Sequence, residues 1–517
     1  MSEDDTQAEV LRFLEGGGLG ETVERIDTHG AFVLLGRAVA WKMKRAVRFS
    51  FMDFSNLAKR EAAVRAELAL NRRTAPALYR AVLPVTREAD GHLVLGGAGR
   101  PVEWLLEMRR FPGEAQLDRV AARGGLTDGI AQRLADVVAR FHDRAEPRPQ
   151  AGGAAAMREV ADGNAADLAS LAPGVLPPDA VADLARGTAA ELARRSGLLD
   201  RRRAEGKVRR CHGDLHLANI VLLDGEPVLF DCLEFSEGLA SIDVLYDLAF
   251  LVMDLAERGL RDRAWRVLQT YGERRVEDEG LVLLPLFLSI RAAVRAKVAG
   301  FTARGTGDSG VREERRREAT AYLDFARVRL EPVPPVLVAI GGRSGTGKST
   351  LAAALAPRIG AVPGATVLRS DVIRKRLLVR QPTERLDADA YGPEMGARVY
   401  TEMAGRAGAL LRAGRAVICD AVYGGEHERR SVERAAAEAG APFRGFWLEA
   451  PEDVLEERVA ARAGDASDAD VTVVRAQRAR VRGDAVVWPR VRADRPPADL
   501  AGDVLSRLGE ELALARP

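Results

Sequence analysis

The spacing of hydrophobic and polar residues changes twice along the first two thirds of the chain. Residues 22–44 alternate in short runs, as β-strands do, and residues 55–73 repeat at the period of a helix. Further strand-like runs follow, and the chain then becomes mainly helical. This order predicts a small β-rich lobe over about residues 1–109 and a helical lobe over about residues 110–331.

A different texture begins after a proline-rich segment. The segment EPVPP at 331–335 ends the preceding helical pattern, because proline lacks the N–H group that a helix needs. The apolar run VLVAIGG follows, and three more strand-like runs alternate with helical patterns. Such alternation predicts a parallel sheet with helices on its faces. We therefore expect a first domain over residues 1–331 and a second over residues 332–517.

Composition and charge limit the classes of protein that fit. A chain of 517 residues is too long for one hydrophobic core and suits two or three domains. Its 77 basic and 75 acidic residues give a formal net charge of +2, which argues against a strongly basic nucleic-acid clamp. The three cysteines have no zinc spacing and cannot form a disulfide framework. No signal peptide or membrane span is recognisable, so we expect a cytoplasmic protein without a membrane or nucleic-acid partner.

The most specific motif, GRSGTGKS at 342–349, lies directly after the apolar run of the second domain. It satisfies the P-loop pattern, whose glycines let main-chain N–H groups surround a phosphate at a helix start. Lys348 would reach the β- and γ-phosphates of ATP, and the Ser349 hydroxyl would bind Mg²⁺. The alternative is a Gly-rich turn without function. The residues predicted to bind ATP here are Gly342, Ser344, Gly345, Thr346, Gly347, Lys348, Ser349 and Thr350.

A second motif, HGDLHLAN at 212–219, lies in the first domain. It has the spacing of a kinase catalytic loop, in which His-x-Asp is followed by four residues and Asn. Asp231 comes twelve residues after Asn219, at the end of an apolar run. Phosphoryl transfer needs a carboxylate that orients or accepts the hydroxyl proton, and oxygen ligands that hold Mg²⁺ against the triphosphate. We expect Asp214 in the first role, and Asn219 and Asp231 in the second.

On these residues the first domain resembles the aminoglycoside phosphotransferase and choline kinase superfamily over roughly residues 20–329. The resemblance implies an α+β, bilobal, protein-kinase-like fold. It also implies a strand lysine that binds the α- and β-phosphates. Lys42 is the first choice, and Lys44, on the same strand face, is the second.

The same resemblance implies two further contacts. The carboxylate partner of the strand lysine is expected to be Glu61, with Glu67 as the alternative. Residues 103–108 are expected to form a hinge strand that presents backbone groups to adenine, with Met108 at its end. The sequence departs from the protein-kinase pattern in two ways: the first hairpin lacks a full Gly-rich loop, and no Phe-Gly follows Asp231. The second departure suits the small-molecule branch of the superfamily.

The acceptor side of the first domain has one candidate residue. Asp247 lies four residues after Asp243 on a predicted helix, which places both on one face. We expect Asp247 to contact the substrate. The alternative is that this pair belongs to a structurally bonded helix start.

The second domain is similar to the small P-loop kinases of the gluconate kinase, chloramphenicol phosphotransferase and zeta-toxin group, over roughly residues 336–515. The resemblance implies an α/β P-loop NTPase fold with a parallel sheet. It implies that Asp371 orients or deprotonates the acceptor hydroxyl, although a helix cap also suits this residue, and that Arg374 contacts the substrate. Asp420 would be a Walker-B-like carboxylate near Mg²⁺. The lid arginines, which would close on the phosphates, are Arg458 and Arg462.

Together these features predict an ATP- and Mg²⁺-dependent phosphotransferase with two kinase-type sites, acting on a hydroxyl of a small polar metabolite such as a sugar. One alternative is that the P-loop half phosphorylates a nucleotide or the end of a polynucleotide. Another is a regulatory or toxin-like protein in which one module binds ATP without transferring phosphate.

Overall fold

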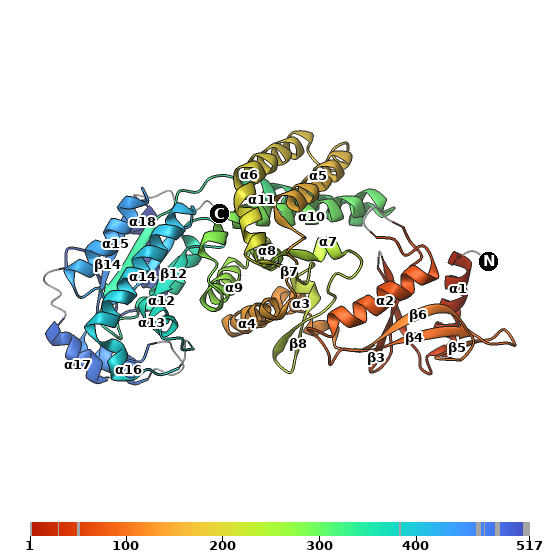
Figure 1. The fold of residues 1–517 in the computed structure, drawn as a ribbon, viewed down its shortest axis with the longest axis horizontal. Coiled ribbons are helices and arrows are strands. Elements are labelled where there is room, and N and C mark those ends of the chain that lie inside the picture. The colour runs from red at the N-terminus through yellow and green to blue at the C-terminus, as the bar shows by residue number, and fades with distance from the viewer. Residues whose placement is uncertain are drawn as a thin grey trace. The chain divides into compact units, whose positions relative to one another are not determined.

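The computed structural model describes residues 3–28, 30–48, 52–381, 384–461, 467–469, 471–480 and 486–509. The chain packs into two compact units, and Figure 1 labels many of their elements. The first unit contains residues 1–160 and 192–254, and the second contains residues 161–191 and 255–517. The domain boundary expected at residue 331 is based on the change in hydrophobic pattern along the sequence and not on packing, and it stays a prediction.

A six-stranded antiparallel sheet, in the order β1-β2-β3-β6-β4-β5, forms the β-rich part of the first unit. Side chains alternate along β3, so Trp41 and Met43 enter one apolar cluster and Ala40 enters another. Lys42 and Lys44 share the face of Ala40 by the same alternation. The strands are β1 (Glu24–Asp27), β2 (Ala31–Leu35), β3 (Val39–Lys44), β4 (Tyr79–Arg87), β5 (Leu93–Leu95) and β6 (Arg100–Arg109).

Two helices pack against this sheet. Helix α2 (Leu57–Asn71) begins after Asn56, whose side chain accepts a hydrogen bond from the Lys59 N–H and so caps the helix. Helix α1 (Glu3–Phe13) places Val10 in the apolar cluster of Trp41 and Met43. The sequence pattern did not reveal α1, because few of its positions are apolar.

The remainder of the first unit is helical with two short pairs of antiparallel strands. The β8–β9 hairpin turns at Asp224-Gly225, where both residues have positive φ (53° and 82°), as a tight two-residue hairpin turn requires. The other pair is β7 with β10. The elements are α3 (Leu117–Ala122), α4 (Asp128–Arg144), β7 (Val208–Arg210), β8 (Ile220–Leu223), β9 (Glu226–Leu229), α7 (Glu237–Ala240) and β10 (Ser241–Asp243).

Three helices carry the chain between the two units. The Ala-, Gly- and Pro-rich stretch at 145–205, expected to hold loop and amphipathic helices, forms α5 (Gly153–Leu171) and α6 (Pro178–Ala204). The third is α8 (Val244–Glu257). None of the helices in the part of the chain that the structure describes has the length and apolarity needed to cross a bilayer.

The second unit is built on a five-stranded sheet in which every neighbouring pair is parallel, in the order β12-β13-β11-β14-β15. The central strand β11 is buried along its whole length, as expected where helices cover both faces. The strands are β11 (Leu337–Gly342), β12 (Thr366–Arg369), β13 (Val417–Asp420), β14 (Phe443–Glu449) and β15 (Arg490–Arg492). The helices that follow them are α12 (Lys348–Leu355), α13 (Ser370–Leu377), α14 (Pro393–Arg412), α15 (Glu426–Glu438), α16 (Glu452–Ala460), α17 (Val471–Arg480) and α18 (Pro497–Gly509).

Helix α9 (Arg261–Arg274) is part of the same core, although it lies before the proline-rich segment. Trp265 packs in one apolar cluster with Val338 and Ile340 of β11. The Gln269 side chain bonds the edge strand β12 reciprocally, accepting from Val367 N at 2.9 Å and donating to Val367 O at 2.8 Å. An amide side chain thus satisfies backbone groups that an edge strand leaves unpaired. Two more helices, α10 (Leu284–Gly305) and α11 (Ser309–Arg329), follow.

Candidate active sites

Two carboxylates of α8 accept hydrogen bonds from main-chain N–H groups of the loop HGDLHLAN in the first unit. Asp247 Oδ1 accepts a hydrogen bond from Gly213 N at 2.9 Å, and its Oδ2 accepts one from His212 N at 3.1 Å. Asp254, two turns further along α8, accepts from Leu217 N at 2.9 Å. Gly213 has φ of 86°, and a Cβ there would lie 2.9 Å from Leu233 Cβ, so the turn requires glycine.

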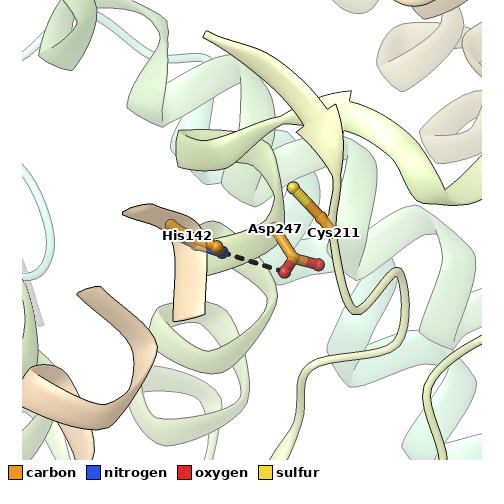
Figure 2. A group of neighbouring side chains, drawn as sticks. All are labelled: His142, Cys211 and Asp247. Atoms are coloured by element: carbon orange, nitrogen blue, oxygen red, sulfur yellow. Dashed lines mark hydrogen bonds and ion pairs between the residues drawn. The ribbon is translucent and has the colours of Figure 1, made fainter. Parts of the chain in front are cut away.

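The prediction that Asp247 contacts the substrate is wrong. Its carboxylate is fully buried, and besides the loop N–H groups it bonds His142 Nε2 at 3.1 Å, as Figure 2 shows. Cys211 lies beside them, and its thiol donates to Ile242 O at 3.4 Å. Because the carboxylate oxygens already accept N–H donors, this group suits the support of the catalytic loop better than a metal.

Asp214 and Asn219 are brought together in the loop. Asn219 Nδ2 donates to Asp214 Oδ2 at 2.8 Å and to Asp214 O at 3.0 Å. With its amide nitrogen turned toward Asp214, Asn219 keeps its amide oxygen as the atom suited to a cation. His216 Nε2 lies 3.3 Å from Asp214 Oδ2, a neighbour that the motif spacing did not single out.

The β8–β9 hairpin brings Asp231 to this loop. Asn219 precedes β8 and Asp231 follows β9, and Phe230 N donates to Asn219 O at 3.0 Å. Asp231 has φ of 61°, a left-handed conformation that costs energy for a residue other than glycine and is often found at functional sites. Tyr79 holds it there, because its hydroxyl oxygen accepts from Asp231 N at 3.0 Å.

Lys42 reaches the same place from β3. Its Nζ lies 2.7 Å from Asp231 Oδ1 and 2.8 Å from Glu67 Oε1. Burial opposes the ammonium charge, but the carboxylates of Asp231 and Glu67 outweigh it, and the pKa of Lys42 lies well above its usual value.

The pairing predicted between Lys42 and Glu61 is wrong, and Glu67 takes that place. The two glutamates are six residues apart on α2, about 1.7 turns, so they point to different sides of the helix. Glu61 forms an ion pair with Arg65 at 3.0 Å on the outer face. Burial works against ionisation of Glu67, but Lys42 and Lys44 lower its pKa to about 2.

Residues 103–108 lie in strand β6, between β3 and β4, where Met108 has Ala40 as its register partner on one side and Tyr79 on the other. Their predicted contact with adenine through backbone groups stays a prediction. The Met108 side chain is buried in an apolar cluster with Ala40 and Val221. Contact between this side chain and a nucleotide stays a prediction.

The P-loop of the second unit joins β11 to α12. Gly342, Gly345 and Gly347 have φ of 142°, 85° and 87°, which residues with a Cβ rarely adopt. A Cβ at Gly342 would lie 2.7 Å from Leu448 O, and one at Gly345 2.7 Å from Leu455 O. The loop therefore needs glycine both for its conformation and for space.

The side chains of the P-loop are arranged for phosphate and metal. Lys348 Nζ donates to Arg343 O at 2.9 Å, which folds the ammonium back over the loop. Ser349 Oγ donates to Asp420 Oδ2 at 2.5 Å, so the predicted pair of Mg²⁺ ligands is in direct contact. Asp420 ends β13 beside Ile340 of the central strand. Thr346 is buried, whereas Thr350 is exposed in the first turn of α12.

The side chain of Gln477 in α17 forms a hydrogen bond with a main-chain N–H group of the P-loop. Its Oε1 accepts from Ser344 N at 2.8 Å, and its Nε2 donates to Ser344 Oγ at 3.1 Å. An N–H group that faces phosphate in P-loops is thus bonded to a side-chain amide. No motif marked this residue in the sequence.

Asp371 lies in the first turn of α13 and is not its cap, since Arg369 holds the cap position. Burial raises the pKa of Asp371, and the negative charge of Asp420 raises it further. Arg374, one turn on, donates to Ala390 O at 2.9 Å and lies over the Tyr391 ring at 4.9 Å. Asp371 and Arg374 are thus one helical turn apart on α13, and the Tyr391 ring lies against Arg374.

Asp468, which follows the predicted lid in sequence, connects two segments of the second site through hydrogen bonds. Asp468 accepts hydrogen bonds from Tyr391 Oη at 2.6 Å and from the buried Lys375 Nζ at 3.0 Å. Arg458 donates to Ala493 O at 2.8 Å, so its role on phosphate stays a prediction. Arg462, the other predicted lid arginine, lies outside the described residues.

Two family models match this chain, each over a different part of it. Residues 10–280 match the family described as the phosphotransferase enzyme family, and residues 337–483 match an AAA domain. An uncharacterized protein of Mycobacterium tuberculosis is 32% identical over 461 residues, 88% of this chain and 89% of that protein.

Two solved structures illustrate the matches at the level of each part. A sugar kinase from Janibacter covers 36% of this chain and 100% of its own, with 20% identity and a TM-score of 0.27. A choline/ethanolamine kinase family protein from Mesorhizobium loti covers 63% of this chain and 99% of its own, with 12% identity and a TM-score of 0.38. The family matches confirm the predicted architecture, a kinase-like domain followed by a P-loop domain with a parallel sheet.

Proposed function

Because this chain belongs to the phosphotransferase enzyme family, we propose that it is an ATP-dependent kinase with two active sites, each transferring the γ-phosphoryl group to a hydroxyl of a small polar metabolite. The observation that carries the proposal is the joint placement of Asp214, Asn219 and Lys42-bound Asp231 around the β8–β9 hairpin. These groups meet the needs of phosphoryl transfer, which are positioning and neutralisation of charge.

The donor sets of both sites suit Mg²⁺, which prefers oxygen ligands. In the first site the Asn219 amide oxygen and the Asp231 carboxylate would hold it. In the second, the Ser349 hydroxyl and the Asp420 carboxylate would do so, and their direct contact supports this assignment. When bound, the ion neutralises negative charge on the phosphates.

In the first site, Asp214 would accept the proton of the acceptor hydroxyl. The oxygen of that hydroxyl would bond to the γ-phosphorus as the bond between this phosphorus and ADP breaks. Lys42 would turn from Asp231 to the α- and β-phosphates. In the second, Asp371 would have the role of Asp214, and its raised pKa brings it closer to the working pH of a general base. Lys348 and the P-loop N–H groups would bind the phosphates.

A sugar-like acceptor in the second site is supported by the groups beside Asp371. Arg374 and the Tyr391 ring offer a charged donor and a flat face, which suit a polar ring. Cys211, Cys232 and Cys419 are buried thiols that form no disulfide, which supports the cytoplasm as the location.

Separate inactivation of the two sites tests the proposal. ATP turnover with a pool of hydroxyl metabolites should fall in Asp214→Ala and in Lys348→Ala, and each variant should lose turnover with a different acceptor or step. An Asp214→Ala variant that keeps all acceptor-dependent turnover would show that the first site does not catalyse.

A further inference from the structure

Five side chains of the first unit form an unbroken row of ion pairs, here called the charge row: Asp231, Lys42, Glu67, Lys44 and Glu234. Lys42 joins Asp231 to Glu67, and Lys44 joins Glu67 to Glu234, at 2.6 Å from Glu67 Oε2 and 2.5 Å from Glu234 Oε1. The two ends of the row, Asp231 and Glu234, are three residues apart in the sequence.

The two ends of the charge row differ in exposure. The Asp231 side chain is 37% exposed and that of Lys42 17%, whereas those of Lys44 and Glu234 are 4% and 7% exposed. A ligand can therefore reach the Asp231–Lys42 end and not the other. The Lys44 ammonium lies over the Phe54 ring at 5.3 Å, which further encloses it.

Glu67 is the shared member, with one oxygen on each lysine. If Lys42 turns toward phosphates, Glu67 loses one partner while remaining fully buried. A buried carboxylate left without a partner is strongly destabilised. Lys44 prevents this, because its contact with Glu67 lies at the end that no ligand reaches.

We propose that Lys44 and Glu234 are positioning residues for the first site: they hold Glu67 in place and neutralised, so that Lys42 can move between Asp231 and the nucleotide. The inference rests on the proposed function of that site. Lys44 also ties the segment after Asp231 to β3, so the same pair fixes the backbone from which Asp231 projects.

The test measures Mg·ATP binding and turnover in the full chain with Lys348→Ala in the background, which silences the P-loop site. Lys44→Met and Glu234→Gln should each weaken Mg·ATP binding or lower kcat by about 10- to 100-fold, the usual effect of removing a group that orients a functional residue. Lys59→Met is the matched control, because Lys59 pairs with Asp53 on the surface and such pairs contribute little. Lys44→Arg should restore part of the activity.

The double variant Lys44→Met/Glu234→Met separates positioning from stability. It leaves no unpaired charge on Glu234, so we expect its melting temperature to recover toward that of the parent while binding and kcat stay low. Recovery of both would overturn the inference and make the pair merely structural. Unchanged Mg·ATP binding in Lys42→Ala would instead contradict the proposed function itself. If Lys42→Ala weakens Mg·ATP binding but Lys44→Met changes neither binding nor kcat, this inference alone is wrong.

Discussion

The carboxylate of Asp247 accepts a hydrogen bond from the main-chain N–H of Gly213, with Oδ1 and N 2.9 Å apart. Because the same carboxylate bonds His212 N and His142, its loss leaves several buried N–H groups unsatisfied at about 1–3 kcal/mol each. We expect Asp247→Ala to lower the free energy of unfolding by several kcal/mol and to abolish turnover at the first site. Urea denaturation and ATP turnover check this, with the exposed Asp90→Ala as the control. Full activity in Asp247→Ala would show that the loop holds its shape without the Asp247 carboxylate.

Gly345 gives a prediction for the P-loop. Alanine there would be strained at φ of 85° and would place its Cβ 2.7 Å from Leu455 O, so Gly345→Ala should abolish nucleotide binding at the second site. Gly396 lies within α14 with open space around it, so Gly396→Ala should be neutral or stabilise by about 0.5–1 kcal/mol. Calorimetric titration with Mg·ATP checks Gly345→Ala, with Lys42→Ala in the background to silence the first site, and urea denaturation checks Gly396→Ala. Normal binding by Gly345→Ala would contradict the role of the loop.

Gln477 gives a prediction of opposite sign. Its side chain occupies Ser344 N, so a phosphate oxygen that binds this N–H must displace it. One such hydrogen bond contributes about 0.5–1.5 kcal/mol, and Gln477→Ala should therefore bind Mg·ATP about 2- to 10-fold more tightly. The titration uses Lys42→Ala in the background to silence the first site. Weaker binding would mean that Gln477 contacts the nucleotide rather than competing with it.

Glu67 gives a pH dependence. Its pKa is lowered from 4.5 to about 2 in the folded protein, because Lys42 and Lys44 outweigh burial. Its stabilising effect is therefore fully present above pH about 4.5 and is lost as the pH falls toward 2. At pH 7 we expect Glu67→Gln to cost about 3–5 kcal/mol, the usual cost of breaking a buried ion pair. Unfolding measured from pH 7 to pH 3 should show this difference shrinking, and a constant difference would count against the assignment.

The sequence predicted the features that lie close together along the chain. The P-loop, the catalytic loop and Asp231 were identified because their spacing is local, and the β8–β9 hairpin then joins the last two. The choice between Glu61 and Glu67 was not open to this reasoning, because it depends on how α2 is rotated against β3. Gln477 and Glu234 were missed for a related reason, since each meets its partner only through packing of distant segments.

The role of α9 was hidden in the same way. Its helical pattern is visible, but the pairing of Gln269 with Val367 depends on an edge strand nearly a hundred residues later.

The most direct test of two phosphotransferase sites is ³¹P NMR of the products formed from Mg·ATP and a pooled library of hydroxyl metabolites. Wild-type protein should give new phosphate ester resonances, and Asp214→Ala and Lys348→Ala should each remove a different one. If both variants give the wild-type spectrum, the two sites do not transfer phosphate and the account is wrong.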